Sequence, residues 1–285
     1  ESTFDAFETF LFVPDTTTSK GAHIRDCNDM KRTMIMVVVA LMPALLFGFY
    51  NTGYMHFLSQ GVQPEFWASL WFGFLKVLPL IVVSYVVGLG IEFAFAQFRG
   101  HEVNEGFLVS GLLIPMIMPV DIPLWMVALS TAFAVVFGKE VFGGYGSYPF
   151  NPAAVGYAVA AVSWPEQVFR YPQPYTNIPL WDATGVPVSS TISDTLRSGG
   201  SLNISAISLV LGEYAAPMGT GAALILLACG LFLWLQKDVR LSASVSFVVT
   251  CALIAFLFPR QVGVNGVDIA LRLQCVRDEL LTGAM

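Results

Sequence analysis

The stretch HEVNEGFLVSGLLIPMIMPVDIP, residues 101–123, decides the expected fold. Its apolar part, residues 107–118, would rise only about 18 Å as an α-helix, against a hydrocarbon core of about 30 Å. Polar residues precede this part, and Pro115, Pro119 and Pro123 close it. A short apolar segment with such ends is typical of a broken or re-entrant membrane helix, which often marks an ion or substrate site. The alternative is an ordinary membrane helix whose end the sequence blurs.

The composition indicates an integral membrane protein. The chain has 285 residues, of which 55% are hydrophobic and 12% are charged, whereas soluble domains carry about 25% charged residues. The net charge of −6 excludes little, because the charges lie between the apolar runs, and it does not suggest a nucleic-acid partner. The four cysteines show no CxxC spacing, so no zinc or iron–sulfur site is indicated.

Apolar runs on both sides of the opening stretch predict further membrane helices. We expect spans at residues 33–49, 75–98, 124–137, 219–235 and 241–258. Gly and Pro residues interrupt the pattern at 138–152, and a second short apolar run follows at 153–164. Residues 51–64 are expected to form a loop, and 165–217 are the one long polar stretch.

These runs divide the sequence into four expected parts: a cytoplasmic segment (1–32), a first membrane repeat (33–164), an extracytoplasmic loop (165–218) and the start of a second repeat (219–285). The last part begins with two spans, as the second part does. An odd number of crossings per repeat would invert the second copy, as in many transporters. We therefore expect an all-α membrane protein with inverted repeats, the second of them incomplete.

The distribution of Lys and Arg predicts the orientation, because cytoplasmic loops carry an excess of both. With a cytoplasmic N-terminus, eight of them lie inside: Lys20, Arg25, Lys31, Arg32, Arg99, Lys139, Lys237 and Arg240. Three lie outside: Arg170, Arg197 and Arg260. The long polar loop then faces outward.

Glu92 is a candidate functional residue because it lies inside an apolar run. A carboxylate in a membrane helix is costly unless it is partnered or protonated. Gly88 and Gly90 beside it leave room for a ring or for a neighbouring helix. The alternative is a satisfied core carboxylate near the interface, about two turns from Arg99.

Glu102, Asn104 and Glu105 precede the short apolar segment and offer hard oxygen ligands that could attract a cation. A solvated cytoplasmic collar is the alternative. Lys139 and Glu140 lie at another expected helix break, but the glycines after them match no standard phosphate loop. Lys76 is expected to snorkel near the end of its span.

Six segments carry a resemblance to a known family. HIRDCNDMKRTMIMVVVALMPALLFGFYNTG (23–53), HEVNEGFLVSG (101–111) and GKEVFGG (138–144) closely resemble the B-type membrane subunit of bacterial Na⁺-translocating NADH:quinone reductase. FNPAAVGY (150–157), SDTLRSG (193–199) and LFLWLQK (231–237) are more similar to the D-type membrane subunit of the homologous Rnf ferredoxin:NAD⁺ complex. The resemblance covers nearly the whole chain.

The resemblance implies two inverted five-helix repeats with broken helices. It implies a flavin-carrying subunit of a multi-subunit complex in the bacterial cytoplasmic membrane, which couples electron transfer toward quinone to Na⁺ or H⁺ movement. An Rnf-type subunit serving ferredoxin and NAD⁺ is one alternative. A channel or transporter without redox function is another, because inverted repeats serve those proteins too.

The family implies that FMN is attached through its phosphate to a threonine in the outer loop, within a motif that ends in Ser/Thr-x-Ala-Thr. This chain has WDATGVPVSSTISDTL (181–196) instead. If TGVP is an insertion, Thr191 takes the place of the flavin-bearing threonine, with Ser190 replacing the alanine. Thr184 keeps the Ala-Thr pair and is the second candidate.

The family also links the helix before HEVNEGF to quinone and inhibitor binding. By position, its glycine and glutamate correspond to Gly88 and Glu92, while another family glycine is Leu89 here. A non-covalent riboflavin is a further cofactor that the resemblance implies, and no residue of the sequence can be assigned to it.

Overall fold

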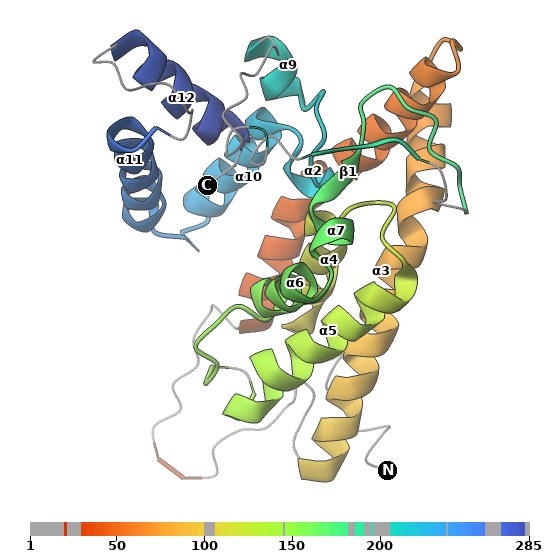
Figure 1. Ribbon diagram of the computed structural model, residues 1–285. Coiled ribbons are helices and arrows are strands. Elements are labelled where there is room, and N and C mark those ends of the chain that lie inside the picture. Colours follow the sequence, from red (N-terminus) through yellow and green to blue (C-terminus); the bar gives the residue numbers. More distant parts are fainter. Residues whose placement is uncertain are drawn as a thin grey trace. The chain divides into compact units, whose positions relative to one another are not determined.

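The computed structural model describes residues 20–21, 30–99, 106–144, 146–181, 186–190, 195, 206–237, 239–259 and 269–282 (Figure 1). The longer helices are α2 (Met30–Ser59), α3 (Phe66–Arg99), α4 (Phe107–Ile117), α5 (Leu124–Gly138), α6 (Pro152–Ser163), α10 (Ala223–Leu235), α11 (Leu241–Leu257) and α12 (Ile269–Thr282). The predicted all-α class is confirmed.

Three described helices are long and apolar enough to cross a membrane: Arg32–Ser59, Phe66–Arg99 and Leu124–Phe142. Four shorter apolar helices accompany them: Phe107–Ile117, Pro152–Ser163, Ala223–Leu235 and Leu241–Leu257. The chain is therefore a multi-pass membrane protein. The short length predicted for the segment after residue 106 is confirmed, because α4 has only 11 residues.

The predicted loop at residues 51–64 is wrong in extent. Helix α2 continues to Ser59 and α3 begins at Phe66, so only six residues connect them. Close packing explains the difference, because a Cβ on Gly53 would overlap the backbone of Ser69, and one on Gly73 would overlap the backbone of Phe49. Small residues that let helix backbones approach this closely stabilise membrane helix pairs.

Helix α4 packs on α3 through hydrogen bonds as well as apolar contacts. Ser84 donates from its hydroxyl to the carbonyl of Gly111 at 2.9 Å. Tyr85 donates to the carbonyl of Leu108 at 2.6 Å. Phe107, which is almost completely buried, lies edge-on to the ring of Tyr85. These contacts fix the short helix against the long one.

Helices α5 and α6 lie side by side, and the chain breaks between them as predicted. Ser130 donates to the carbonyl of Gly156 at 2.6 Å, across this interface. A one-turn 3₁₀-helix, η1 (Glu140–Phe142), follows α5. Gly143 and Gly144 then adopt φ values of +103° and +91°, which only glycine adopts readily.

The polar stretch expected after residue 164 carries short elements: α7 (Pro165–Val168), β1 (Arg170–Pro172), β2 (Val188–Ser190), α9 (Ala206–Leu211) and η2 (Met218–Thr220). The two strands are antiparallel, with Arg170 opposite Ser190 and Tyr171 opposite Ser189. A hydrogen bond of 3.0 Å from the backbone nitrogen of Gln173 to the carbonyl of Pro187 extends the pairing.

Helices α10 and α11 lie where two spans were predicted after the polar stretch, but with 13 and 17 residues they belong to the shorter apolar helices. The connecting turn places Lys237 at a φ of +65°. Helix α12 packs against α11, as Figure 1 shows. The contact includes Arg272, whose guanidinium donates to the carbonyl of Phe256 at 3.0 Å.

The described residues fall into two compact units that interleave along the sequence. Unit 1 takes its residues from Glu1–Val39, Pro79–Pro115 and Pro123–Ser163, and unit 2 takes the remainder. The helices that contribute to both units carry Pro43, Pro79 and Pro115, each at or near a unit boundary. Proline weakens a helix locally because it removes one backbone hydrogen bond. The four-part division and the inverted repeat stay predictions.

Candidate functional sites: a charge network and a cavity

Glu92 lies in unit 1 on α3, and its side chain is only 2% exposed. One carboxylate oxygen, Oε1, is paired with the ammonium of Lys139, which accounts for the carboxylate in an apolar helix. The other, Oε2, is buried and has no hydrogen-bond partner among the described residues. The structure therefore shows a partnered carboxylate with one acceptor oxygen remaining.

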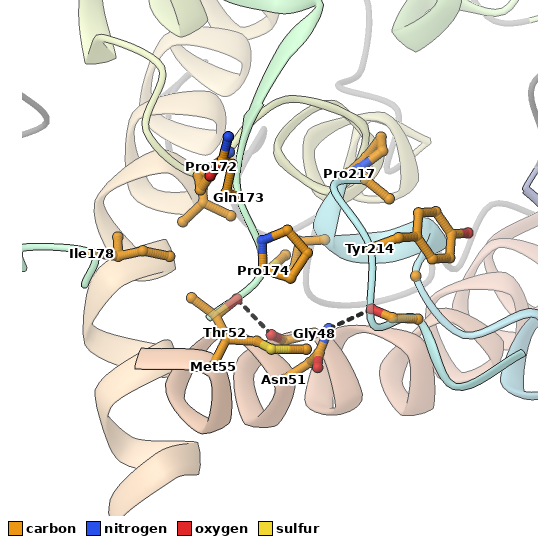
Figure 2. Close-up of a pocket in the computed structure, with 15 residues that line it drawn as sticks. Gly48, Asn51, Thr52, Met55, Pro172, Gln173, Pro174, Ile178, Tyr214 and Pro217 are labelled. Carbon is orange, nitrogen blue, oxygen red and sulfur yellow. Dashed lines mark hydrogen bonds between the residues drawn. The ribbon is translucent and has the colours of Figure 1, made fainter. Parts of the chain in front are cut away.

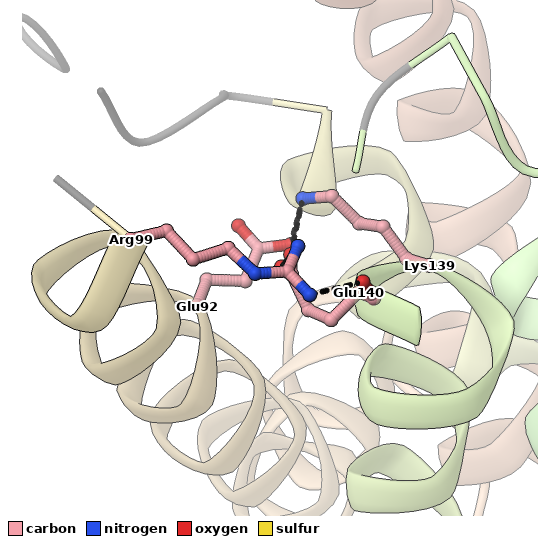
Figure 3. Close-up of polar contacts among 4 residues, drawn as sticks. All are labelled: Glu92, Arg99, Lys139 and Glu140. Atoms are coloured by element: carbon pink, nitrogen blue, oxygen red, sulfur yellow. Dashed lines mark hydrogen bonds and ion pairs between the residues drawn. The ribbon is translucent and has the colours of Figure 1, made fainter. Parts of the chain in front are cut away.

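The break after α5 brings two further charged groups to Glu92. Lys139 and Glu140 are both nearly buried, with side chains 5% and 4% exposed. Arg99, at the end of α3, donates to the backbone carbonyl of Glu140 at 2.9 Å and lies 3.6 Å from its carboxylate. Figure 3 shows these four side chains converging from α3 and from the end of α5.

We call Glu92, Arg99, Lys139 and Glu140 the charge network. Two cations face two carboxylates, so their formal charges cancel. A buried charge is costly unless it is paired, and each member here has an opposite charge within 4.0 Å. The sequence identified Glu92 and the Lys139–Glu140 pair separately, but it did not connect them.

Gly88 lies one turn before Glu92, and the ring of Phe107 fills the space beside it. A Cβ on Gly88 would overlap that ring, whereas a Cβ on Gly90 would meet no atom within 4 Å. Of the two uses predicted for these glycines, the structure shows close packing of a neighbouring helix at Gly88.

A cavity of about 70 Å³ lies in unit 2 beside α2. Its lining includes Asn51 and Thr52 from α2, Gln173 after β1, and Tyr214 and Met218 near η2. We call it the α2 cavity. Asn51 donates from its amide to the carbonyl of Gly212 at 3.2 Å, and Thr52 donates to the carbonyl of Gly48 at 2.8 Å (Figure 2). No Asp, Glu, Lys or Arg is among the described lining residues.

Tyr214 lines this cavity and Tyr175 follows the lining residue Pro174, and both lie outside the spanning helices. Burial raises the pKa of the Tyr214 hydroxyl above its usual value of 10.0. Partial burial, followed by the nearby Glu213 carboxylate, also raises the pKa of Tyr175. Both side chains are therefore neutral at physiological pH, and the cavity region presents uncharged hydroxyl groups.

Lys76 does not snorkel as predicted, because its side chain is only 6% exposed. Its ammonium donates to the carbonyl of Pro179 at 2.8 Å and lies 2.9 Å from Asp121. Neither carboxylate oxygen of Asp121 has a hydrogen-bond partner among the described residues, so this contact is an ion pair. Val120 and Ile178, the neighbours of these partners, line the α2 cavity. The pair thus supports one wall of the cavity.

Several predicted site residues lie outside the described part of the chain: Thr184, Thr191, Glu102 and Glu105. Strand β2 ends at Ser190, so the described chain stops one residue before Thr191. No group of three or more His, Cys, Asp and Glu side chains suited to a metal ion occurs among the residues that the structure describes.

The family model described as NQR2, RnfD, RnfE matches residues 17–285. The chain belongs to this family. Among relatives named as the B-type subunit of Na⁺-translocating NADH-quinone reductase, that of Ectopseudomonas mendocina is 35% identical over 262 residues, covering 82% of this chain and 63% of the relative. That of Chromohalobacter salexigens is 32% identical over 280 residues, covering 90% of this chain and 66% of the relative. The chain thus spans less than two thirds of these relatives' length.

Proposed function

We propose that this member of the NQR2, RnfD, RnfE family is a membrane subunit of an ion-translocating oxidoreductase. In this proposal it carries FMN on Thr191 and passes electrons toward quinone within a multi-subunit complex. The observation that carries the proposal is the family match over residues 17–285, which includes both the loop and the Glu92 helix. The relatives' name supplies the donor, the acceptor and the ion, namely NADH, quinone and Na⁺.

The described ends of the loop suit a tethered cofactor. Strand β2 is paired with β1 up to Ser190, so Thr191 follows directly from a hydrogen-bonded strand. A phosphoester on a threonine hydroxyl leaves the redox ring of the flavin unmodified, and the ring supplies the electron chemistry. Thr184 is the alternative attachment residue. A riboflavin is a second proposed cofactor without assigned contacts.

On the quinone side, we assign Glu92 and Gly88 to the helix that binds quinone. The Oε2 atom of Glu92 can accept a hydrogen bond, and Lys139 holds the other oxygen. Glu92→Gln in the assembled complex should lower quinone-dependent turnover or weaken inhibition at the quinone site. Unchanged kinetics would leave Glu92 with a structural role only. Glu102 and Glu105 remain the proposed cation-attracting residues, for Na⁺ or H⁺.

The orientation that we propose, in the bacterial cytoplasmic membrane with the N-terminus inside, can be tested with single cysteines. In a variant without native cysteines, Val188→Cys should react with an impermeant thiol reagent added outside intact cells. Gln236→Cys, in the turn after α10, should react only after the membrane is opened. The opposite labelling would reverse the proposed orientation.

The decisive experiment for the flavin is a denaturing gel of the purified chain viewed under ultraviolet light. A fluorescent band is expected for the natural sequence and for Thr184→Val, and a dark band for Thr191→Val at equal protein amount. A dark band for the natural sequence would instead favour the channel or transporter without redox function.

An Rnf-type role is the second candidate, because the matching family model includes RnfD. Membranes that contain the complex would then reduce NAD⁺ with reduced ferredoxin, whereas the first candidate oxidises NADH with quinone. The two assays on the same membranes separate these candidates.

A further inference from the structure

The α2 cavity and the strand that leads to Thr191 belong to one hydrogen-bonded structure. Pro172, the last residue of β1, and Gln173 both line the cavity. The backbone nitrogen of Gln173 donates to the carbonyl of Pro187 at 3.0 Å, immediately before β2. Strand β2 then ends at Ser190. A cofactor on Thr191 therefore begins from a strand that is paired with the cavity wall.

We propose that the α2 cavity receives the pyrimidine edge of the flavin ring. This inference rests on the proposed function, because it requires a flavin tethered at Thr191. It goes beyond that function by assigning Asn51, Thr52, Tyr214 and Met218 as the residues that hold one end of the ring.

The polar groups of the cavity match this edge, which presents one N–H donor between two carbonyl groups. Asn51 uses its amide nitrogen to bond Gly212, and this contact fixes the orientation of the side chain. No described residue donates to its oxygen, which is thus an acceptor for the flavin N–H. Thr52 donates to Gly48, which leaves its oxygen lone pairs as a second acceptor. Gln173 contributes an amide that can donate to a flavin carbonyl.

The size and the apolar lining also fit one end of a planar ring. The cavity volume of about 70 Å³ is smaller than a whole tricyclic ring, but the cavity is partly open. Tyr214 offers an aromatic face, and Met55 and Met218 offer thioethers, which make favourable contacts with aromatic rings. In this proposal the remainder of the ring lies outside the cavity.

Two glycines let the segments around the cavity pack closely against one another. A Cβ on Gly48 would overlap the side chain of Met218. Gly212 has a φ of +79°, and a Cβ there would overlap the backbone of Gly221. The close approach of these segments brings the carbonyl of Gly212 to Asn51. The residues present thus form a preorganised, uncharged cradle.

The test is the midpoint potential of the covalently bound flavin in the purified complex. Asn51→Asp keeps the side-chain size but adds a negative charge beside the ring, which disfavours the reduced, more negative form. We expect Asn51→Asp to bind the reduced ring more weakly relative to the oxidised ring than the natural chain does. The ratio of the two binding constants, reduced over oxidised, should be at least tenfold lower. This fall corresponds to a potential lower by about 30 mV for a two-electron couple.

Thr52→Val is the second variant, because it is nearly isosteric and its hydroxyl bonds only within α2 among the described residues. It should alter the flavin absorption spectrum while gel fluorescence stays unchanged. Thr250→Val, on α11 and away from the cavity lining, is the matched control and should change neither property.

The outcomes separate this inference from the proposed function. If the natural chain is fluorescent but Asn51→Asp and Thr52→Val retain its potential and spectrum, the cavity assignment is wrong and the flavin function stands. If Asn51→Asp does not fold, Thr52→Val alone decides, and a spectrum identical to that of the natural chain overturns the inference. If the natural chain carries no covalent flavin, both the function and the inference fail.

Discussion

The charge network and the α2 cavity differ in the kind of buried polar group that they contain: charged side chains in the network and neutral ones in the cavity. The network gathers two acidic and two basic side chains from α3 and the end of α5, and each lies within 4.0 Å of a group of opposite formal charge. The lining of the cavity includes amides, hydroxyls, an aromatic ring, thioethers and several prolines, with no Asp, Glu, Lys or Arg among its described residues. Both include groups able to accept a further hydrogen bond.

This difference predicts how substitutions in each region affect the stability of the protein. In the network, removal of one partner leaves a buried charge uncompensated, and this is strongly destabilising. In the cavity, the loss of one neutral hydrogen bond costs only about 0.5–1.5 kcal/mol in stability. We therefore expect substitutions in the network to affect folding first, and substitutions in the cavity to affect ligand properties first.

The largest effect is expected for Lys139→Met. It leaves the Glu92 carboxylate buried without its ammonium partner, at a cost of about 3–5 kcal/mol in the free energy of unfolding. Thermal unfolding of the purified protein in detergent measures the loss. The double variant Lys139→Met with Glu92→Gln should recover much of it, because no charge is then left alone at this contact. Equal stability of the single and double variants would show that the pair is not coupled.

A smaller loss is expected for Lys76→Met, which tests whether the cavity region also depends on a buried ion pair. Asp121 is about 10% exposed and retains some access to solvent, so the loss should lie below that of Lys139→Met. The double variant Lys76→Met with Asp121→Asn is the control and should be more stable than Lys76→Met. A loss as large as that of Lys139→Met would remove the contrast between the two regions.

The smallest effect on stability is expected for substitutions of the glycines of α3. Comparing Gly88 with Gly90 tests whether Gly88 is needed for packing against Phe107. Gly88→Ala forces its Cβ against Phe107 and should cost about 1–3 kcal/mol, as overpacked cores do. Gly90→Ala meets no atom within 4 Å and should be neutral or stabilising by up to about 1 kcal/mol, since alanine favours helix. Equal melting temperatures for the two variants would contradict the packing role of Gly88.

The local sequence pattern correctly predicted two features of the fold, the short helix α4 and the break after α5. The shortness of α4 followed from the length of its apolar run, and the break after Lys139 followed from its glycines. The ends of α2 and α3 were missed, because the close contacts of Gly53 and Gly73 form only when the two helices pack against each other. Polar residues such as Asn51 and Thr52 suggested a loop, although both side chains donate hydrogen bonds to backbone carbonyls in the folded chain.

The sites required contacts that no local pattern reveals. Lys139 lies 47 positions after Glu92, and Gly212 lies 161 positions after Asn51. A buried carboxylate and a lysine at a helix break were both visible, but their pairing depends on the fold of unit 1. The α2 cavity gave no sequence signal, since asparagine, threonine and methionine are common in helices without any site.

The most direct test of the central claim is mass spectrometry of the loop peptide that contains Thr184 and Thr191, from the purified natural chain. The account predicts the added mass of FMN on Thr191, with its loss in Thr191→Val and its retention in Thr184→Val. FMN on Thr184, or on neither threonine, would contradict it.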